Sequence, residues 1–108
     1  MKSSLQELEQ PIDEAIANGL IEATPEWWNA AILEIESCPQ SNGVEGFRHR
    51  ITSPEGQRDI VQATESIHEH TFRLADLFRQ HGRPWRKVVY TVTKQAGGSW
   101  KYSADFSY

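Results

Sequence analysis

The end of the chain, residues 85–108, reads WRKVVYTVTKQAGGSWKYSADFSY. Apolar and polar side chains alternate over residues 85–94 and again over residues 99–108. The apolar members are Val88, Tyr90 and Val92 in the first run and Trp100, Tyr102, Ala104, Phe106 and Tyr108 in the second. Successive side chains of a strand point to opposite faces of a sheet, so this pattern is typical of half-buried strands. The glycine-containing residues 95–98 predict a turn between them, and hence a β-hairpin.

A second hairpin is predicted earlier in the chain, with strands over residues 27–38 and 44–52. Residues 39–43 form a turn cluster between the strands, and residues 53–56 close the second one. The alternating residues are Ala31, Leu33 and Ile35 against Glu34 and Glu36, and Phe47, His49 and Ile51 against Arg48 and Arg50. Each strand therefore offers one face to a core and one to solvent.

An amphipathic helix is predicted over residues 4–18. Its apolar residues recur at steps of three and four, as Leu5, Leu8, Ile12, Ala15, Ile16 and Leu20. Ser3 or Ser4 can cap its start, and Asn18-Gly19 predicts its end. Pro11 leaves two alternatives, because an interior proline loses a backbone hydrogen bond: either the helix kinks there or it begins there.

A longer helix is predicted from residue 57 or 59 to His81. Its broad apolar face consists of Ile60, Ala63, Ile67, Thr71, Leu74, Leu77 and Phe78. Gly82 ends it, and Pro84 prevents its continuation.

The predicted order of elements is α-β-β-α-β-β, which indicates an α+β domain. Two hairpins form a four-stranded antiparallel sheet, and the two helices cover one face of it. The other face is open to solvent and displays Glu34, Glu36, Arg48, Arg50, Lys87, Thr91, Lys101 and Asp105.

The length of the chain, 108 residues, fits one domain over residues 1–108. Cys38 is the single cysteine, so neither an intrachain disulfide nor a cysteine-based metal site is expected. The first residues lack the apolar run of a signal peptide, and no run of apolar residues is long enough to span a membrane. We therefore expect a cytoplasmic protein.

The net charge of −4 is distributed unevenly. Residues 1–45 carry nine acidic residues and one basic residue, whereas residues 46–108 carry ten basic and six acidic residues. An acidic half repels nucleic acid and attracts a basic protein partner. The alternative is a charged surface that serves only solubility.

The residues that most often carry chemistry are not arranged for catalysis. His68 and His70 lie two residues apart on a predicted helix, where they point in different directions and cannot share a metal ion. We expect His49 to be a hydrogen-bonded histidine at the core or its rim, and Cys38 to be a buried structural thiol. The carboxylate pairs Asp13/Glu14 and Glu34/Glu36 are expected to be solvated. The sequence therefore predicts a protein that is not an enzyme and has no catalytic residue, metal or cofactor.

Aromatic residues beside basic ones, at residues 85–87 and 100–102, suggest a single-stranded nucleic acid as a possible ligand. Such proteins are usually basic, whereas this chain has an isoelectric point near 5.5. We therefore assign Trp100 and Tyr102 to the core face of the hairpin and expect no direct contact with nucleic acid.

Two segments resemble the YezG-like immunity proteins. Residues 25–33, PEWWNAAIL, resemble the Pro-Glu-x-Trp entry into that family's first strand. Residues 84–92, PWRKVVYTV, with GSWKY at 98–102 and FSY at 106–108, are similar to its closing Pro-Trp hairpin and Phe-x-Tyr end. The resemblance assigns a structural role to Pro25, Trp27, Pro84, Trp85, Trp100, Phe106 and Tyr108. The chain departs from the family's pattern over residues 47–60, which leaves the identity of the partner open.

The resemblance implies a cytoplasmic antitoxin that binds and neutralises a secreted bacterial toxin, often a nuclease, of a polymorphic toxin system. The alternative is an adaptor or chaperone that escorts a secreted effector without inhibiting it. We predict that the toxin-binding residues are Glu26, Trp28, Glu34, Glu36, Arg48, Arg50 and Asp105. For Glu34 and Glu36 the alternative is pairing with Arg48 and Arg50 across the first hairpin.

Overall fold

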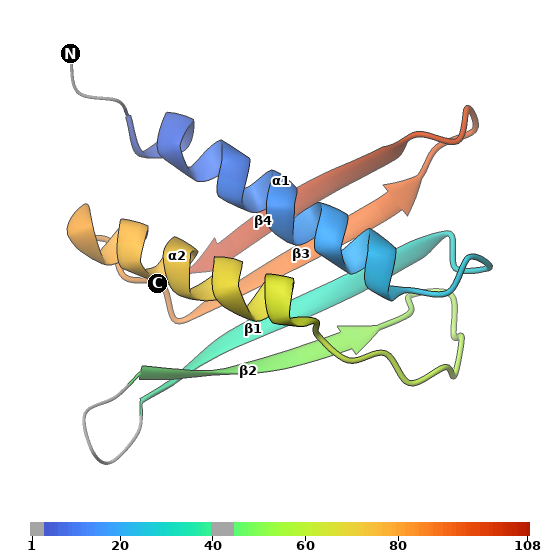
Figure 1. Ribbon diagram of the computed structural model, residues 1–108, viewed down its shortest axis with the longest axis horizontal. Helices are drawn as coiled ribbons and strands as arrows, with labels where there is room; N and C mark the ends of the chain where they lie inside the picture. Colours follow the sequence, from blue (N-terminus) through green and yellow to red (C-terminus); the bar gives the residue numbers. More distant parts are fainter. Residues whose placement is uncertain (1–3, 40–44) are drawn as a thin grey trace.

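The computed structural model describes residues 4–39 and 45–108. Its elements are α1 (Leu5–Ala23), β1 (Ala30–Pro39), β2 (Glu45–Thr52), α2 (Glu65–Gln80), β3 (Lys87–Lys94) and β4 (Trp100–Ser107). The antiparallel strands lie in the order β2-β1-β3-β4, and both helices lie on one face of the sheet (Figure 1). The predicted α+β architecture is therefore confirmed. Residues 40–43 of the predicted turn, and Val44, lie outside the described residues.

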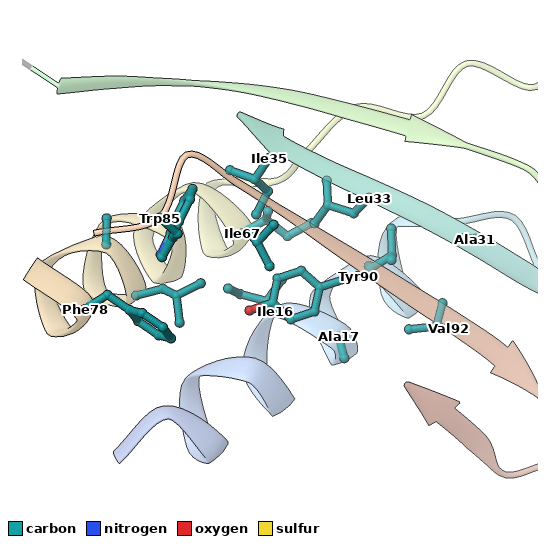
Figure 2. Packing of buried hydrophobic residues seen from close by; sticks show 14 of the residues in the cluster. Ile16, Ala17, Ala31, Leu33, Ile35, Ile67, Phe78, Trp85, Tyr90 and Val92 are labelled. Atoms are coloured by element: carbon teal, nitrogen blue, oxygen red, sulfur yellow. The ribbon is translucent and has the colours of Figure 1, made fainter. Parts of the chain in front are cut away.

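The core fills the space between the helices and the inner face of the sheet (Figure 2). Leu33 and Ile35 of β1 and the alternating residues of β3 have no exposed surface, as the period of two predicted. The largest fully buried residues include Ile16 and Leu20 from α1, Ile67, Leu74 and Phe78 from α2, and Val88, Tyr90 and Val92 from β3. Each fully buried side chain of this size stabilises the fold by about 1.5–3 kcal/mol.

The first helix extends further than predicted, to Ala23 instead of residue 18. Ser4 caps it, because its Oγ accepts a hydrogen bond from the Glu7 N–H at 3.2 Å. Pro11 lies inside the helix, so the alternative in which the helix begins there is wrong. Gly19 does not end the helix either: it is buried where α1 packs against α2, and a Cβ atom at this position would lie 3.0 Å from Cγ1 of Ile67. The glycine serves close helix packing.

We expect Gly19→Leu to lower the free energy of unfolding by about 1–3 kcal/mol, because the new side chain overlaps Ile67. Leucine is a better helix former than glycine, so any loss must come from packing. Asn18→Leu is the matched control, since Asn18 is exposed and gains the same kind of helix propensity. Urea denaturation measures both, and equal stability of the two variants would contradict the packing role.

The second helix begins later than predicted, at Glu65 instead of residue 57 or 59. Thr64 has an extended backbone, and its Oγ1 accepts the Ile67 N–H at 3.3 Å, which caps the helix there. Residues 57–64 therefore form a loop. Ile60, which was predicted on the apolar face of the helix, is 91% exposed.

The last strand is an edge strand, and this limits how deeply its side chains are buried. Tyr102 lies opposite Val92 and Phe106 opposite Val88, so both are on the helix side of the sheet as predicted. Tyr102 is nevertheless 39% exposed, and Trp100 and Phe106 are half-buried. The helices cover the centre of the sheet more fully than β4.

Candidate functional site

A groove lies between α1 and the inner side of β4 and has a volume of about 680 Å³. Its lining includes Glu9, Gln10 and Asp13 from α1 and Tyr102, Phe106 and Tyr108 from the end of the chain. A smaller hollow of about 220 Å³ lies further along α1, beside Glu14 and Trp100, and Tyr102 lines both. We call the two together the α1–β4 groove. One wall is acidic and the other is aromatic.

Asp13 is the buried carboxyl group of this groove and is only 5% exposed. The Tyr90 hydroxyl donates a hydrogen bond of 2.5 Å to its Oδ1, and its side chain also hydrogen-bonds with Glu9, one helical turn earlier. Burial raises the pKa of Asp13 to about 8, and the hydrogen bond with Glu9 adds to the rise, whereas the bond from Tyr90 opposes it. Asp13 therefore carries a proton near neutral pH.

The tyrosines around Asp13 remain neutral donors. Burial, followed by the nearby Asp13, raises the pKa of Tyr90 far above its usual value. Burial also raises the pKa of Tyr102, and Asp13, Glu14 and Glu9 add to this effect. The groove therefore presents neutral hydroxyl groups beside the carboxyl groups of Glu9 and Glu14, and carboxylate oxygens suit a cationic side chain.

Stacked rings form the aromatic wall at the far end of the groove. Phe106 stacks on Phe78 at a centroid distance of 4.8 Å and on Tyr108 at 6.5 Å. The guanidinium of Arg83 lies 5.1 Å from the centre of the Tyr108 ring. Arg83 therefore makes a cation–π contact with Tyr108, the kind of contact by which an aromatic ring attracts a basic side chain.

The sequence does not predict this site, and the expected solvated carboxylate pair Asp13/Glu14 is wrong for Asp13, which is buried. A signal was present in the spacing. Asp13 precedes Ile16, Ala17 and Leu20 by three, four and seven residues, so it shares their buried side of the helix. An acidic residue within an apolar stripe indicates either a buried partner or a site.

The open face of the sheet holds most of the predicted toxin-binding residues. Glu34 lies opposite Arg50 and Glu36 opposite Arg48, and Nζ of Lys87 is 3.2 Å from Oε1 of Glu34. Asp105 lies on β4, opposite Val89. Acidic and basic residues are therefore interleaved, which favours pairing within the sheet over an acidic docking strand. Binding through this face remains a prediction.

The burial of the adjacent tryptophans is the reverse of what their predicted roles require. Trp28, predicted to bind the toxin, is 1% exposed and belongs to the core, so this prediction is wrong. Trp27, expected to be structural, is 61% exposed. Both residues precede β1 in a turn, where the Trp28 N–H donates to the Pro25 carbonyl at 3.0 Å. Glu26 is exposed in the same turn.

The other motif positions differ in burial. Trp85 is 4% exposed and packs against Phe47 at a ring distance of 5.5 Å, as a structural role requires. Pro25 is half-buried and Pro84 is exposed. Tyr108 is 54% exposed and belongs to the groove more than to the core.

His49 and Cys38 lie in surroundings that suit a role in the fold. His49 Nε2 lies 2.9 Å from Oγ1 of Thr71, which confirms the predicted hydrogen-bonded histidine. Burial lowers its pKa to about 4, and the nearby His68 contributes to the shift. Cys38 is half-buried, less than predicted. Over residues 4–39 and 45–108, no three His, Cys, Asp or Glu side chains are grouped to hold a metal ion.

Neither helix in the described part of the chain is long and apolar enough to cross a membrane. No known family model matches the chain, and no curated protein matches its sequence.

Proposed function

We propose that this protein is an immunity protein: it binds a secreted bacterial toxin and neutralises it by occluding the active or substrate-binding site. The α1–β4 groove is the observation that carries this proposal, because Glu9 and Glu14 on one wall and the aromatic rings on the other suit a basic protein surface. The resemblance of residues 25–33 and 84–108 to YezG-like immunity proteins supports the same function. The proposal includes a cytoplasmic location and no need for a cofactor.

Electrostatics support a nuclease as the toxin. Besides the protonated Asp13, the α1 sequence contains Glu7, Glu9, Glu14 and Glu22 and no basic residue. Nucleases hold phosphate groups with basic residues, so an acidic helix is attracted to that surface over distance and competes for the same place. The exposed rings of Tyr102 and Tyr108 add apolar contact area beside the charges.

The experiment uses the toxin domain encoded by a neighbouring reading frame. Expression of that domain is expected to stop bacterial growth, and co-expression of this protein is expected to restore it. Growth that stays arrested although the two proteins bind would favour the adaptor or chaperone alternative. Absence of binding would contradict both functions for that partner.

Two matched double variants locate the interface. We expect Glu9→Gln/Glu14→Gln, in the groove, to weaken binding by about 10- to 100-fold, or about 1.4–2.8 kcal/mol. Glu34→Gln/Glu36→Gln removes the same charge from the open face of the sheet. Affinities are measured by calorimetry across a salt series, because screening weakens charged contacts. If only the open-face variant loses affinity, the interface lies on the sheet.

A further inference from the structure

Two loops that are distant in sequence are fastened together at one end of the molecule. The segment between α1 and β1 and the long loop between β2 and α2 meet at this end (Figure 1). Oδ2 of Asp59 accepts hydrogen bonds from Nε1 of Trp27 at 2.9 Å and from Nε1 of Trp28 at 3.0 Å. The Asn29 N–H donates to Oε1 of Glu55 at 3.2 Å. Carboxylates of the long loop therefore hold the tryptophan segment in place.

The loop that supplies these carboxylates is itself ordered by local hydrogen bonds. Oγ of Ser53 accepts the N–H groups of Glu55 and Gln57, each at 3.2 Å. Gly56 has a φ of 80°, a conformation that glycine adopts without strain, and its N–H donates to the Ser53 carbonyl at 3.3 Å. The position of Asp59 is therefore defined by the turn before it as well as by the two indoles.

Two large apolar side chains are exposed where the loops meet. Trp27, whose indole donates to Asp59, is 61% exposed. Ile60, the residue after Asp59, is 91% exposed. We name these two residues, with the carboxylates of Glu26, Glu55 and Asp59, the tip patch. An isoleucine that is 91% exposed contributes little to the core. Exposed apolar side chains that gather at one end of a domain often mark interaction sites.

The fixed indole makes the tip patch suited to binding. A side chain that is already immobilised loses little conformational entropy when it enters a partner's pocket. Tryptophan is also among the residues that most often dominate the energy of protein interfaces. The two indole hydrogen bonds lower the pKa of Asp59, so its charge persists beside the apolar pair.

We propose that the tip patch is the apolar anchor with which this protein holds the basic toxin domain, a proposal that rests on the function proposed above. The complementary surface is an apolar pocket with lysine or arginine at its rim. The charges support this choice, because Glu26, Glu55 and Asp59 outnumber the adjacent Arg58. A second copy of this chain fits poorly, since two acidic rims would face each other.

The test measures binding of the toxin domain from the neighbouring reading frame to Trp27→Ala, Ile60→Ala and the double variant. We expect each single change to weaken binding at least 10-fold and the double change at least 100-fold. Growth rescue should be lost in the double variant. Phe72→Ala is the matched control, because Phe72 is a 54% exposed aromatic residue on α2 that lies outside the patch.

Asp59→Asn separates the negative charge of Asp59 from the hydrogen bonds that it accepts. The amide oxygen can still accept the indole N–H groups, so we expect an unchanged melting temperature, a smaller loss of affinity and a weaker dependence on salt. Trp27→Ala/Ile60→Ala with the affinity of the wild type would overturn the anchor while the immunity function stands. A wild-type protein that neither binds the domain nor restores growth would overturn both.

Discussion

Replacement of Trp28 by alanine is expected to lower the free energy of unfolding by about 3–5 kcal/mol, the usual cost of deleting a large buried ring. Trp28 is 1% exposed and belongs to the hydrophobic core. The substitution leaves a cavity and also removes one of the two indole hydrogen bonds to Asp59. If a domain of this size has a stability of about 5–15 kcal/mol, the change removes a large part of it.

Trp27→Ala is the control for this prediction, because the two residues are adjacent and share the same hydrogen-bond acceptor. Trp27 is 61% exposed, so we expect its removal to cost at most about 1 kcal/mol, the net value of a typical hydrogen bond. Guanidinium denaturation followed by circular dichroism measures both variants. Equal losses would show that the two indoles do not divide into a core residue and a surface residue.

The second large effect concerns pH. The pKa of Asp13 is 3.8 in a free chain and about 8 in the folded protein. The folded state therefore holds a proton that the unfolded state releases between these values. The contribution of this group to stability is fully present below about pH 4 and is lost as the pH rises through 8. Through this group the free energy of unfolding falls by at most about 1.4 kcal/mol per pH unit.

The measurement is best made between pH 6.5 and 8.5. At lower pH the titration of His49 changes the stability in the opposite direction. Its lowered pKa, about 4 against 6.5, gives stability that is present above pH 6.5 and lost as the pH falls toward 4. Asp13→Asn keeps an acceptor for the Tyr90 hydroxyl and removes the titration. We expect its stability to be nearly flat in this window, while the wild type loses about 2 kcal/mol.

Glu7→Gln is the matched control for this experiment, since Glu7 is an exposed acid near the start of the same helix. Its stability should fall with pH as the wild type does. If Asp13→Asn retained the wild-type slope, the proton would not reside on Asp13 in the folded protein. Chemical denaturation at a series of pH values at constant ionic strength gives all three curves.

Much of the architecture was predictable from the sequence, for a local physical reason. A strand that is covered on one face must alternate apolar and polar residues, and a helix on a sheet must carry an apolar stripe, so both patterns are written in adjacent residues. These periods predicted four strands and two helices in the right order. They also predicted the inward direction of Leu33, Tyr90 and Phe106 and the outward direction of Glu34 and Glu36.

The end of α1 and the start of α2 differ from the prediction because of contacts with distant parts of the chain. Gly19 has the local character of a helix end, but α1 continues because the missing side chain lets Ile67 of α2 approach. Ile60 fits the apolar stripe of α2, yet Asp59 beside it binds two indoles and the helix begins only after the Thr64 cap. In each case a contact between distant residues outweighed the local preference.

The sequence alone determined the α+β class, the antiparallel hairpins, the charge of each half and the alternation that defines the core, since each depends on the composition or period of neighbouring residues. Only the tertiary structure decided which tryptophan of the pair is buried and which carboxyl group is withdrawn from water. Trp27 and Trp28 are chemically identical, and both indoles donate to Asp59, more than thirty residues later. Their environments differ because the folded chain packs Trp28 into the core and leaves Trp27 at the surface. Burial in the folded chain raises the pKa of Asp13, and the hydroxyl that donates to it comes from Tyr90, on a strand near the other end of the chain.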